Sequence, residues 1–202
     1  MDTSIPIQLS SYRLGDLIYA NLTYGEAMKL SRENPDSIGK DYIITPKKIL
    51  VSCIDTVISL VNKHTQKYLH LFPHDISEST VIHLRLGDVM AGNEWHEIEK
   101  RPFSIDYLKS IVPLTNKIYV IGKMHFGDVS STQCSTNYEE SVNKSNKYLY
   151  DVLNEFNASH FDGGFADIDL CLAIKAKCFV QGKGYFSKLI VDIRTKLNLQ
   201  CL

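Results

Sequence analysis

The segment Thr80-Val-Ile-His-Leu-Arg-Leu-Gly-Asp88 is the most informative stretch of this chain for its fold. Its first half is a short run of β-branched and aliphatic residues, which predicts a buried strand over 80–84. Its second half places Arg85, Gly87 and Asp88 directly after that strand. In open α/β sheets, ligands bind just outside the carboxyl ends of the strands. The segment therefore predicts a strand that ends at a ligand site.

The polar residues of this segment fit two interpretations. The guanidinium of Arg85 is a planar, permanently charged fork that suits phosphate oxygens, and Gly87 lets the backbone turn sharply near a ligand. Arg85 could instead pair with Asp88 to hold the turn. His83 lies on the same strand face as Arg85. It either bonds the loop or a substrate, or is a satisfied imidazole of the core. The residues alone leave these alternatives open.

Downstream of this segment, short apolar runs alternate with segments of helical periodicity. The pattern predicts strands at 80–84, 117–121, 157–161 and 178–181, and helices near 104–112, 145–156, 167–177 and 185–196. Ser104 is placed to cap the first of these helices. Such alternation indicates right-handed βαβ units around a mainly parallel sheet. We therefore expect an α/β fold with a Rossmann-like domain at 80–202.

The first 79 residues are expected to form a smaller, separate region, 1–79. We expect a strand at 5–9, a helix at 16–30 and a further helix over about 46–62. Thr45-Pro46 opens the last helix, with threonine as the N-cap and proline at the first helical position. Its broad apolar stripe must be buried on the following domain or at an interface.

The composition is that of an ordinary globular protein. Hydrophobic residues make up 44% of the chain, charged residues 22%, and the formal net charge is −1. This balance gives no basis for broad electrostatic binding to nucleic acid. Residues 1–6 include neither a basic nor an apolar region, and no apolar run approaches the ~18 residues of a membrane span. We therefore expect an intracellular, soluble protein.

We expect neither covalent catalysis nor a metal site. The five cysteines are scattered and form no CxxC pair. His70 and His74 are four residues apart, but Pro73 lies between them and no acidic motif accompanies them. Asp167 and Asp169 open a predicted helix, where the positive end of the helix dipole stabilises acids. No cofactor is expected.

The pattern His-x-Arg-x-Gly-Asp, formed by His83, Arg85, Gly87 and Asp88, resembles the signature of fucosyltransferases that use GDP-fucose. These are the alpha-1,2- and alpha-1,6-fucosyltransferases and the protein O-fucosyltransferases. A second segment, Asp169–Ser187, is similar to the late alpha-1,2-fucosyltransferase segment. In that family segment an Asp-Leu opens a helix, and an aliphatic strand then precedes Ser-Ser-Phe-Ser. The two motifs occur here in the family's order.

This resemblance, which covers roughly residues 80–197, implies a fold and an activity. The fold is the nucleotide-sugar-binding, C-terminal domain of a GT-B glycosyltransferase, with region 1–79 as a reduced acceptor side. The activity is transfer of fucose from GDP-fucose to a glycan or protein hydroxyl, without a metal. The implied partners are therefore a nucleotide sugar and a glycan or protein acceptor.

The resemblance also implies roles for individual residues. Arg85 would hold the β-phosphate of the donor and stabilise the charge that develops as the sugar–phosphate bond breaks. His83, Gly87 and Asp88 would shape the loop. The resemblance identifies no base, and the residues offer Asp88 as a candidate for accepting the proton of the acceptor hydroxyl. The residues that would frame the nucleotide from the later units are Asp169, Tyr185, Phe186 and Ser187. Strands 80–84 and 179–181 should therefore be neighbouring or near-neighbouring, and parallel.

The chain departs from the family pattern in places that bear on the site. Gly184-Tyr185 stands where the family has Ser-Ser, and Gly122-Lys123-Met124-His125 replaces an acid-rich loop. Because only 79 residues precede the first motif, we expect acceptor binding to be weak or to depend on a second subunit, as in a homo-oligomer. The alternative functions are an inactive nucleotide- or sugar-binding module and a structural or interaction protein on a Rossmann-like scaffold.

Overall fold

The computed structural model describes residues 54–87, 89–90, 101–113, 117–125, 138–164 and 166–202. The expected strand at 5–9, the helix at 16–30 and the helix start at Thr45-Pro46 lie outside these residues. Asp88, the expected proton acceptor, lies outside them as well.

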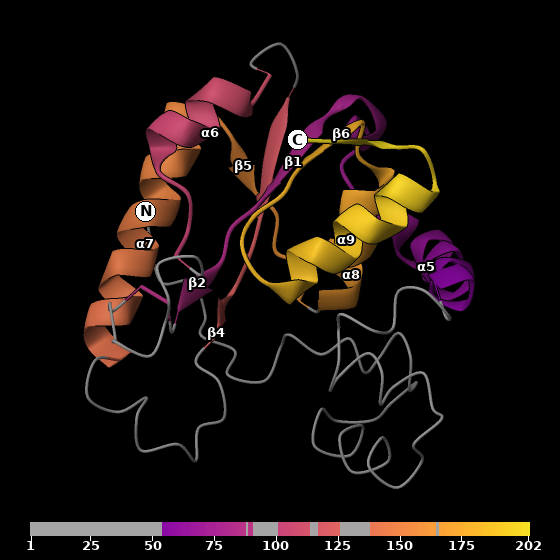
Figure 1. The fold of residues 1–202 in the computed structure, drawn as a ribbon, viewed down its shortest axis with the longest axis horizontal. Coiled ribbons are helices and arrows are strands. Elements are labelled where there is room, and N and C mark those ends of the chain that lie inside the picture. Colours follow the sequence, from indigo (N-terminus) through magenta and orange to yellow (C-terminus); the bar gives the residue numbers. More distant parts are fainter. Residues whose placement is uncertain (1–53, 88, 91–100, 114–116, 126–137, 165) are drawn as a thin grey trace, which may run out of the picture.

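A five-stranded parallel sheet forms the centre of the structure (Figure 1). In spatial order its strands are β5 (Ser159–His160), β3 (Ile118–Ile121), β1 (Thr80–His83), β6 (Cys178–Val180) and β7 (Gln200–Cys201). Every neighbouring pair is parallel. Numbered along the chain, these strands have the order 3-2-1-4-5, which is typical of doubly wound nucleotide-binding folds. The predicted α/β class and parallel sheet are confirmed.

Helices cover both faces of this sheet (Figure 1). One face carries α6 (Ile105–Ile111) and α7 (Tyr138–Glu155), and the other carries α8 (Ala166–Lys175) and α9 (Tyr185–Lys196). Helix α5 (Ile54–Tyr68) packs outside α8. The connections that leave β1 and β6 therefore lead to opposite faces. The carboxyl ends of these two strands form the topological switch point, where doubly wound folds bind their ligands.

Alternating side chains of the central strands build two cores. Val81, Ile121 and Phe179 pack towards α8 and α9, whereas Ile82 and Val180 pack towards α6 and α7. Because both faces are covered, β1, β3 and β6 are buried at every position. This explains why these strands appear in the sequence as continuous apolar runs rather than as alternating ones.

The strands and helices predicted over 80–196 are all present, with shifted ends. The largest shift is in α7, which was predicted near 145–156 and begins at Tyr138. Residues 138–144 lie outside the predicted range yet belong to this helix, and Ser141 is buried on it. The short pair β2 (Leu86–Gly87) and β4 (Met124–His125) and the edge strand β7 were not predicted.

Helix α5 joins the same packed unit as the sheet. Val61 is buried in the core formed with α8 and α9, and Ile58 packs against that core. The thiol of Cys171 in α8 lies 3.7 Å from the Val61 carbonyl oxygen. The apolar stripe predicted for this helix is thus buried at Val61 and partly buried at Ile58. The expected domain boundary at residue 79 stays a prediction. No described helix combines the length and apolar character needed to cross a bilayer.

Candidate functional site at the switch point

The two sequence motifs meet at the switch point. β1 and β6 are adjacent parallel strands, with Ile82 opposite Val180, so the neighbour relation predicted for 80–84 and 179–181 is confirmed. Arg85 follows β1 directly, and the turn 181–184 connects β6 to α9. The residues after both strands therefore share the carboxyl edge of the sheet.

The chain segments approach each other closely at this edge. A Cβ atom on Gly182 would lie 2.2 Å from the carbonyl oxygen of His83 and 2.6 Å from its Nδ1. Any larger residue would therefore push the turn away from β1. The His83 ring lies 5.2 Å, centroid to centroid, from the ring of Phe186 at the start of α9.

His83 is a buried, neutral group. Burial, followed by the charge of Arg85, lowers the pKa of its imidazole to about 3. The sequence left open whether His83 contacts the loop or a substrate, or is a satisfied imidazole of the core. The ring is buried in the core, but its Nδ1 has no hydrogen-bond partner among the described residues. The neutral imidazole therefore adds no positive charge beside Arg85.

Arg85 lies against the first residues of α9. Gly184 is the N-cap of this helix, with φ 92° and ψ 172°, a conformation that only glycine adopts readily. A Cβ atom at this position would lie 3.0 Å from Nη1 of Arg85. Glycine at position 184 therefore makes room for the guanidinium beside the helix start.

Two residues expected to frame the nucleotide hold backbone turns. Ser187 is fully buried, and its hydroxyl accepts a hydrogen bond of 2.8 Å from the Gly182 N–H. Asp169, in the first turn of α8, is also fully buried, and its Oδ1 accepts from the Gly163 N–H at 3.2 Å. Burial outweighs the opposing charge of Lys123 and raises the pKa of Asp169 to about 8. The Asp169 carboxyl is therefore mostly uncharged at neutral pH.

The turn that carries Gly87 is anchored to α7. Gly87 has φ 91°, and its N–H donates to the Ser145 hydroxyl at 3.0 Å. The Ser145 hydroxyl in turn donates to the Ser141 carbonyl at 2.7 Å. Sequence reasoning missed Ser145. The available signal was the spacing of the two serines, which places them on one face of a helix.

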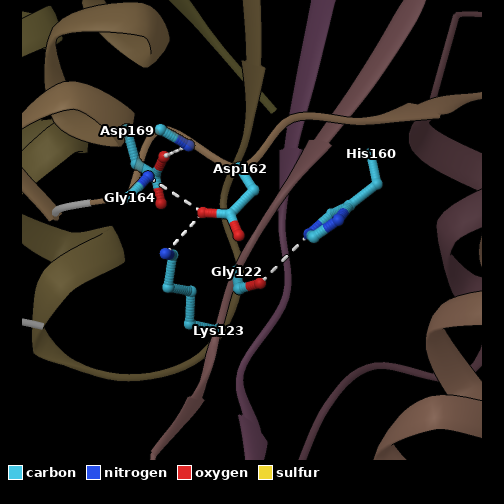
Figure 2. Close-up of polar contacts among 7 residues, drawn as sticks. Gly122, Lys123, His160, Asp162, Gly164 and Asp169 are labelled. Carbon is cyan, nitrogen blue, oxygen red and sulfur yellow. Dashed lines mark hydrogen bonds and ion pairs between the residues drawn. The ribbon is translucent and has the colours of Figure 1, made fainter. Parts of the chain in front are cut away.

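A second polar cluster lies where β3 and β5 end (Figure 2). Lys123 forms an ion pair with Asp162, whose Oδ1 also accepts from the Gly164 N–H at 2.9 Å. Nearby, Nε2 of His160 lies 3.3 Å from the Gly122 carbonyl oxygen, and burial lowers the pKa of this imidazole. Lys123 and His160 were missed as site residues. The signal for Lys123 was a lysine two residues after a buried strand, at a ligand-binding edge.

The remaining expected residues are placed as follows. Tyr185 is the first residue of α9, and Asp88 lies outside the described residues.

Within the described parts of the chain, no group of three or more His, Cys, Asp or Glu side chains is arranged to hold a metal ion. A guanidinium beside a helix start is suited to an anionic ligand such as a phosphate.

Comparison with known proteins adds no relative. No protein-family model matches the sequence, and no curated protein matches it at a significant level.

Proposed function

We propose that this chain is a glycosyltransferase that transfers fucose from GDP-fucose to a hydroxyl of a glycan or protein. The observation that carries the proposal is the position of Arg85 beside Gly184, at the switch point between β1 and β6. Doubly wound folds bind nucleotides at such points. The His-x-Arg-x-Gly-Asp pattern, through its resemblance to the GDP-fucose enzymes, narrows the ligand to this donor.

In the proposed reaction, the acceptor hydroxyl attacks the anomeric carbon of fucose as the bond to the β-phosphate breaks. The electron pair of that bond leaves with GDP, so negative charge grows on the β-phosphate. Arg85, whose guanidinium lies beside the start of α9, stabilises this charge. The first N–H groups of α9 have no partner within the helix and favour the same anion. Asp88 accepts the acceptor proton, and no metal takes part.

The surrounding residues give these groups their positions. Ser187 and Asp169 stabilise the turns that precede α9 and α8 through hydrogen bonds to backbone N–H groups. The rings of His83 and Phe186 pack against each other and join the end of β1 to the start of α9. Tyr185 contributes its backbone N–H at the helix start. These residues thus support the donor site through the geometry of its loops.

Titration with nucleotides tests the proposal. Calorimetry should show that the purified chain binds GDP more tightly than UDP or ADP. Incubation with GDP-fucose should then release GDP, slowly when water is the acceptor and faster when a glycan that accepts the fucosyl group is present. Failure to bind any of the three nucleotides would contradict the proposal. Binding all three equally would remove the assignment of guanine.

A nucleotide-binding module without transferase activity is the second candidate function. It is favoured by the full burial of Asp169 and Ser187, whose side chains contact the chain's own backbone rather than an open site. The same two measurements separate the candidates. GDP binding without any release of GDP from GDP-fucose, with or without an acceptor, is the result expected of the module.

A further inference from the structure

Lys123 is a buried cation at the carboxyl edge of β3. Only 7% of its side chain is exposed, and it forms an ion pair with Asp162, whose side chain is 36% exposed. Figure 2 shows the Lys123 ammonium directed towards Asp162 and the start of α8. A buried ammonium is costly unless it is paired. A positive charge is therefore buried at this edge of the sheet, although lysine side chains are rarely buried in proteins.

The strand register places Lys123 beside Arg85. β1 and β3 pair His83 with Ile121, and the short strands that follow pair Leu86 with Met124 in the same register. Arg85 is thus opposite Lys123, and neighbouring strands lie ~4.8 Å apart.

Both side chains extend from the same face of the sheet. Leu84, Leu86 and Met124 pack into the core beside α7. Because strand side chains alternate between faces, Arg85 and Lys123 are directed to the other face, which carries α8 and α9. The contacts of Lys123 with Asp162 and of Arg85 with Gly184 agree with this placement.

The described charges on this face favour an anion. His83 is neutral because burial lowers its pKa to about 3, and Asp169 is mostly uncharged because burial raises its pKa to about 8. Among the described side chains at this edge, Arg85 and Lys123 carry positive charge, and Asp162 is the anionic partner of Lys123. The starts of α8 and α9 add two partial positive charges to the same region.

We infer that Lys123 is a second cation of the donor-phosphate site and binds the diphosphate together with Arg85. The inference rests on the proposed function and deepens it. An ammonium carries three donors, so one group can serve both Asp162 and phosphate oxygens. In glycosyl transfer, the two cations share the negative charge that the leaving nucleoside diphosphate gains. Monophosphates, which offer one phosphate instead of two, depend less on the second cation.

The test compares GDP and GMP binding in the wild type, in Lys123→Met, and in the double variant Lys123→Met, Asp162→Asn. The double variant removes both charges of the ion pair, so it controls for an unpaired Asp162 and for loss of folding, which thermal unfolding monitors. Lys123→Met should bind GDP roughly ten- to a hundredfold more weakly. GMP affinity should change less, and the double variant should stay weak for GDP because the cation is still missing.

Three results would overturn the inference. Unchanged GDP affinity in Lys123→Met would overturn the inference about Lys123 and leave the proposed function intact. Recovery of wild-type GDP affinity in the double variant would also do so, because Lys123 would then serve only to neutralise Asp162. No GDP binding by the wild type would remove the proposed function and this inference together.

Discussion

At the scale of single residues, Arg194 shows how one buried side chain connects three elements. It is fully buried in α9. Its guanidinium donates to the carbonyls of Ala173 at 2.6 Å and Ala176 at 2.9 Å, at the end of α8, and to that of Gln200 at 2.7 Å, in β7. The planar fork of arginine supplies several donors in fixed directions, which lysine cannot reproduce. The carboxyl-terminal end of α8 is thereby capped by a cation, which also suits the helix dipole.

Replacing Arg194 should therefore destabilise the fold. We expect Arg194→Met to lower the free energy of unfolding by ~3 kcal/mol or more, because several buried carbonyls lose their donors. Arg194→Lys should recover only part of this loss. Urea unfolding measures both, with Lys196→Met, an exposed cation on the same helix, as the control. A loss below ~1 kcal/mol for Arg194→Met would contradict this role.

Gly184 and Gly164 form a matched pair for the position of Arg85. Both have positive φ, 92° and 83°, but a Cβ atom meets Arg85 only at Gly184 and meets nothing within 4 Å at Gly164. Changing either to alanine should cost ~1–3 kcal/mol of backbone strain. GDP affinity should fall clearly in Gly184→Ala and little in Gly164→Ala. Equal losses of affinity would show that contact with the guanidinium is unimportant.

Asp169 should make stability depend on pH. Its pKa is raised from 3.8 to about 8 in the folded chain, so between these values the folded state binds more protons than the unfolded state. The resulting stability is fully present below about pH 4 and is lost as the pH rises through 8. Asp169→Asn has no titratable carboxyl at this position, so it lacks this pH-dependent contribution to stability. Its unfolding free energy relative to wild type should rise by at least ~1 kcal/mol between pH 5 and pH 9. Denaturant unfolding of both proteins across this pH range measures the difference. A difference in unfolding free energy that stays constant with pH would contradict the raised pKa of Asp169.

At the scale of secondary-structure elements, most of the fold was readable from the sequence. Ser104 was predicted as an N-cap, and its hydroxyl accepts the Tyr107 N–H at 3.2 Å. Helix 185–196 was predicted with its observed ends. The helix start at Tyr138 was missed because the first turns of this helix bury polar Ser141, and a periodicity read from apolar residues does not detect a buried serine. The two-residue strands β2, β4 and β7 depend on partners far along the chain, so local sequence carries little signal for them.

The contact between α7 and β2 should control the turn that carries Gly87. Ser145→Ala leaves the buried Gly87 N–H without its acceptor, which typically costs ~1–3 kcal/mol. GDP affinity should fall in parallel, because the turn that follows Arg85 loses its anchor. Ser141→Ala is the control, since Ser141 contributes its backbone carbonyl to this chain of hydrogen bonds. Thermal unfolding and GDP titration should separate the two variants, and identical behaviour would argue against the anchor.

At the scale of the whole molecule, the strand order explains how much of the site could be foreseen. The sequence predicted that 80–84 and 179–181 would be neighbours, and that placement brings Arg85 to the start of α9. The meeting of Lys123 with Asp162 and Asp169 was not foreseen. It requires the crossover that carries α8 from the edge strand β5 to β6. Burial, which neutralises His83 and Asp169, likewise appears only in three dimensions.

The measurement that bears most directly on the proposed donor site is GDP binding by wild type and Arg85→Ala. A charge-assisted phosphate contact is typically worth ~1.5–3 kcal/mol, so we expect a roughly ten- to a hundredfold loss of affinity with unchanged thermal stability. Asp88→Ala should not lower stability either. Equal GDP affinity in wild type and Arg85→Ala would contradict the assignment. A shared loss of stability in Arg85→Ala and Asp88→Ala would show instead that Arg85 only holds its own turn.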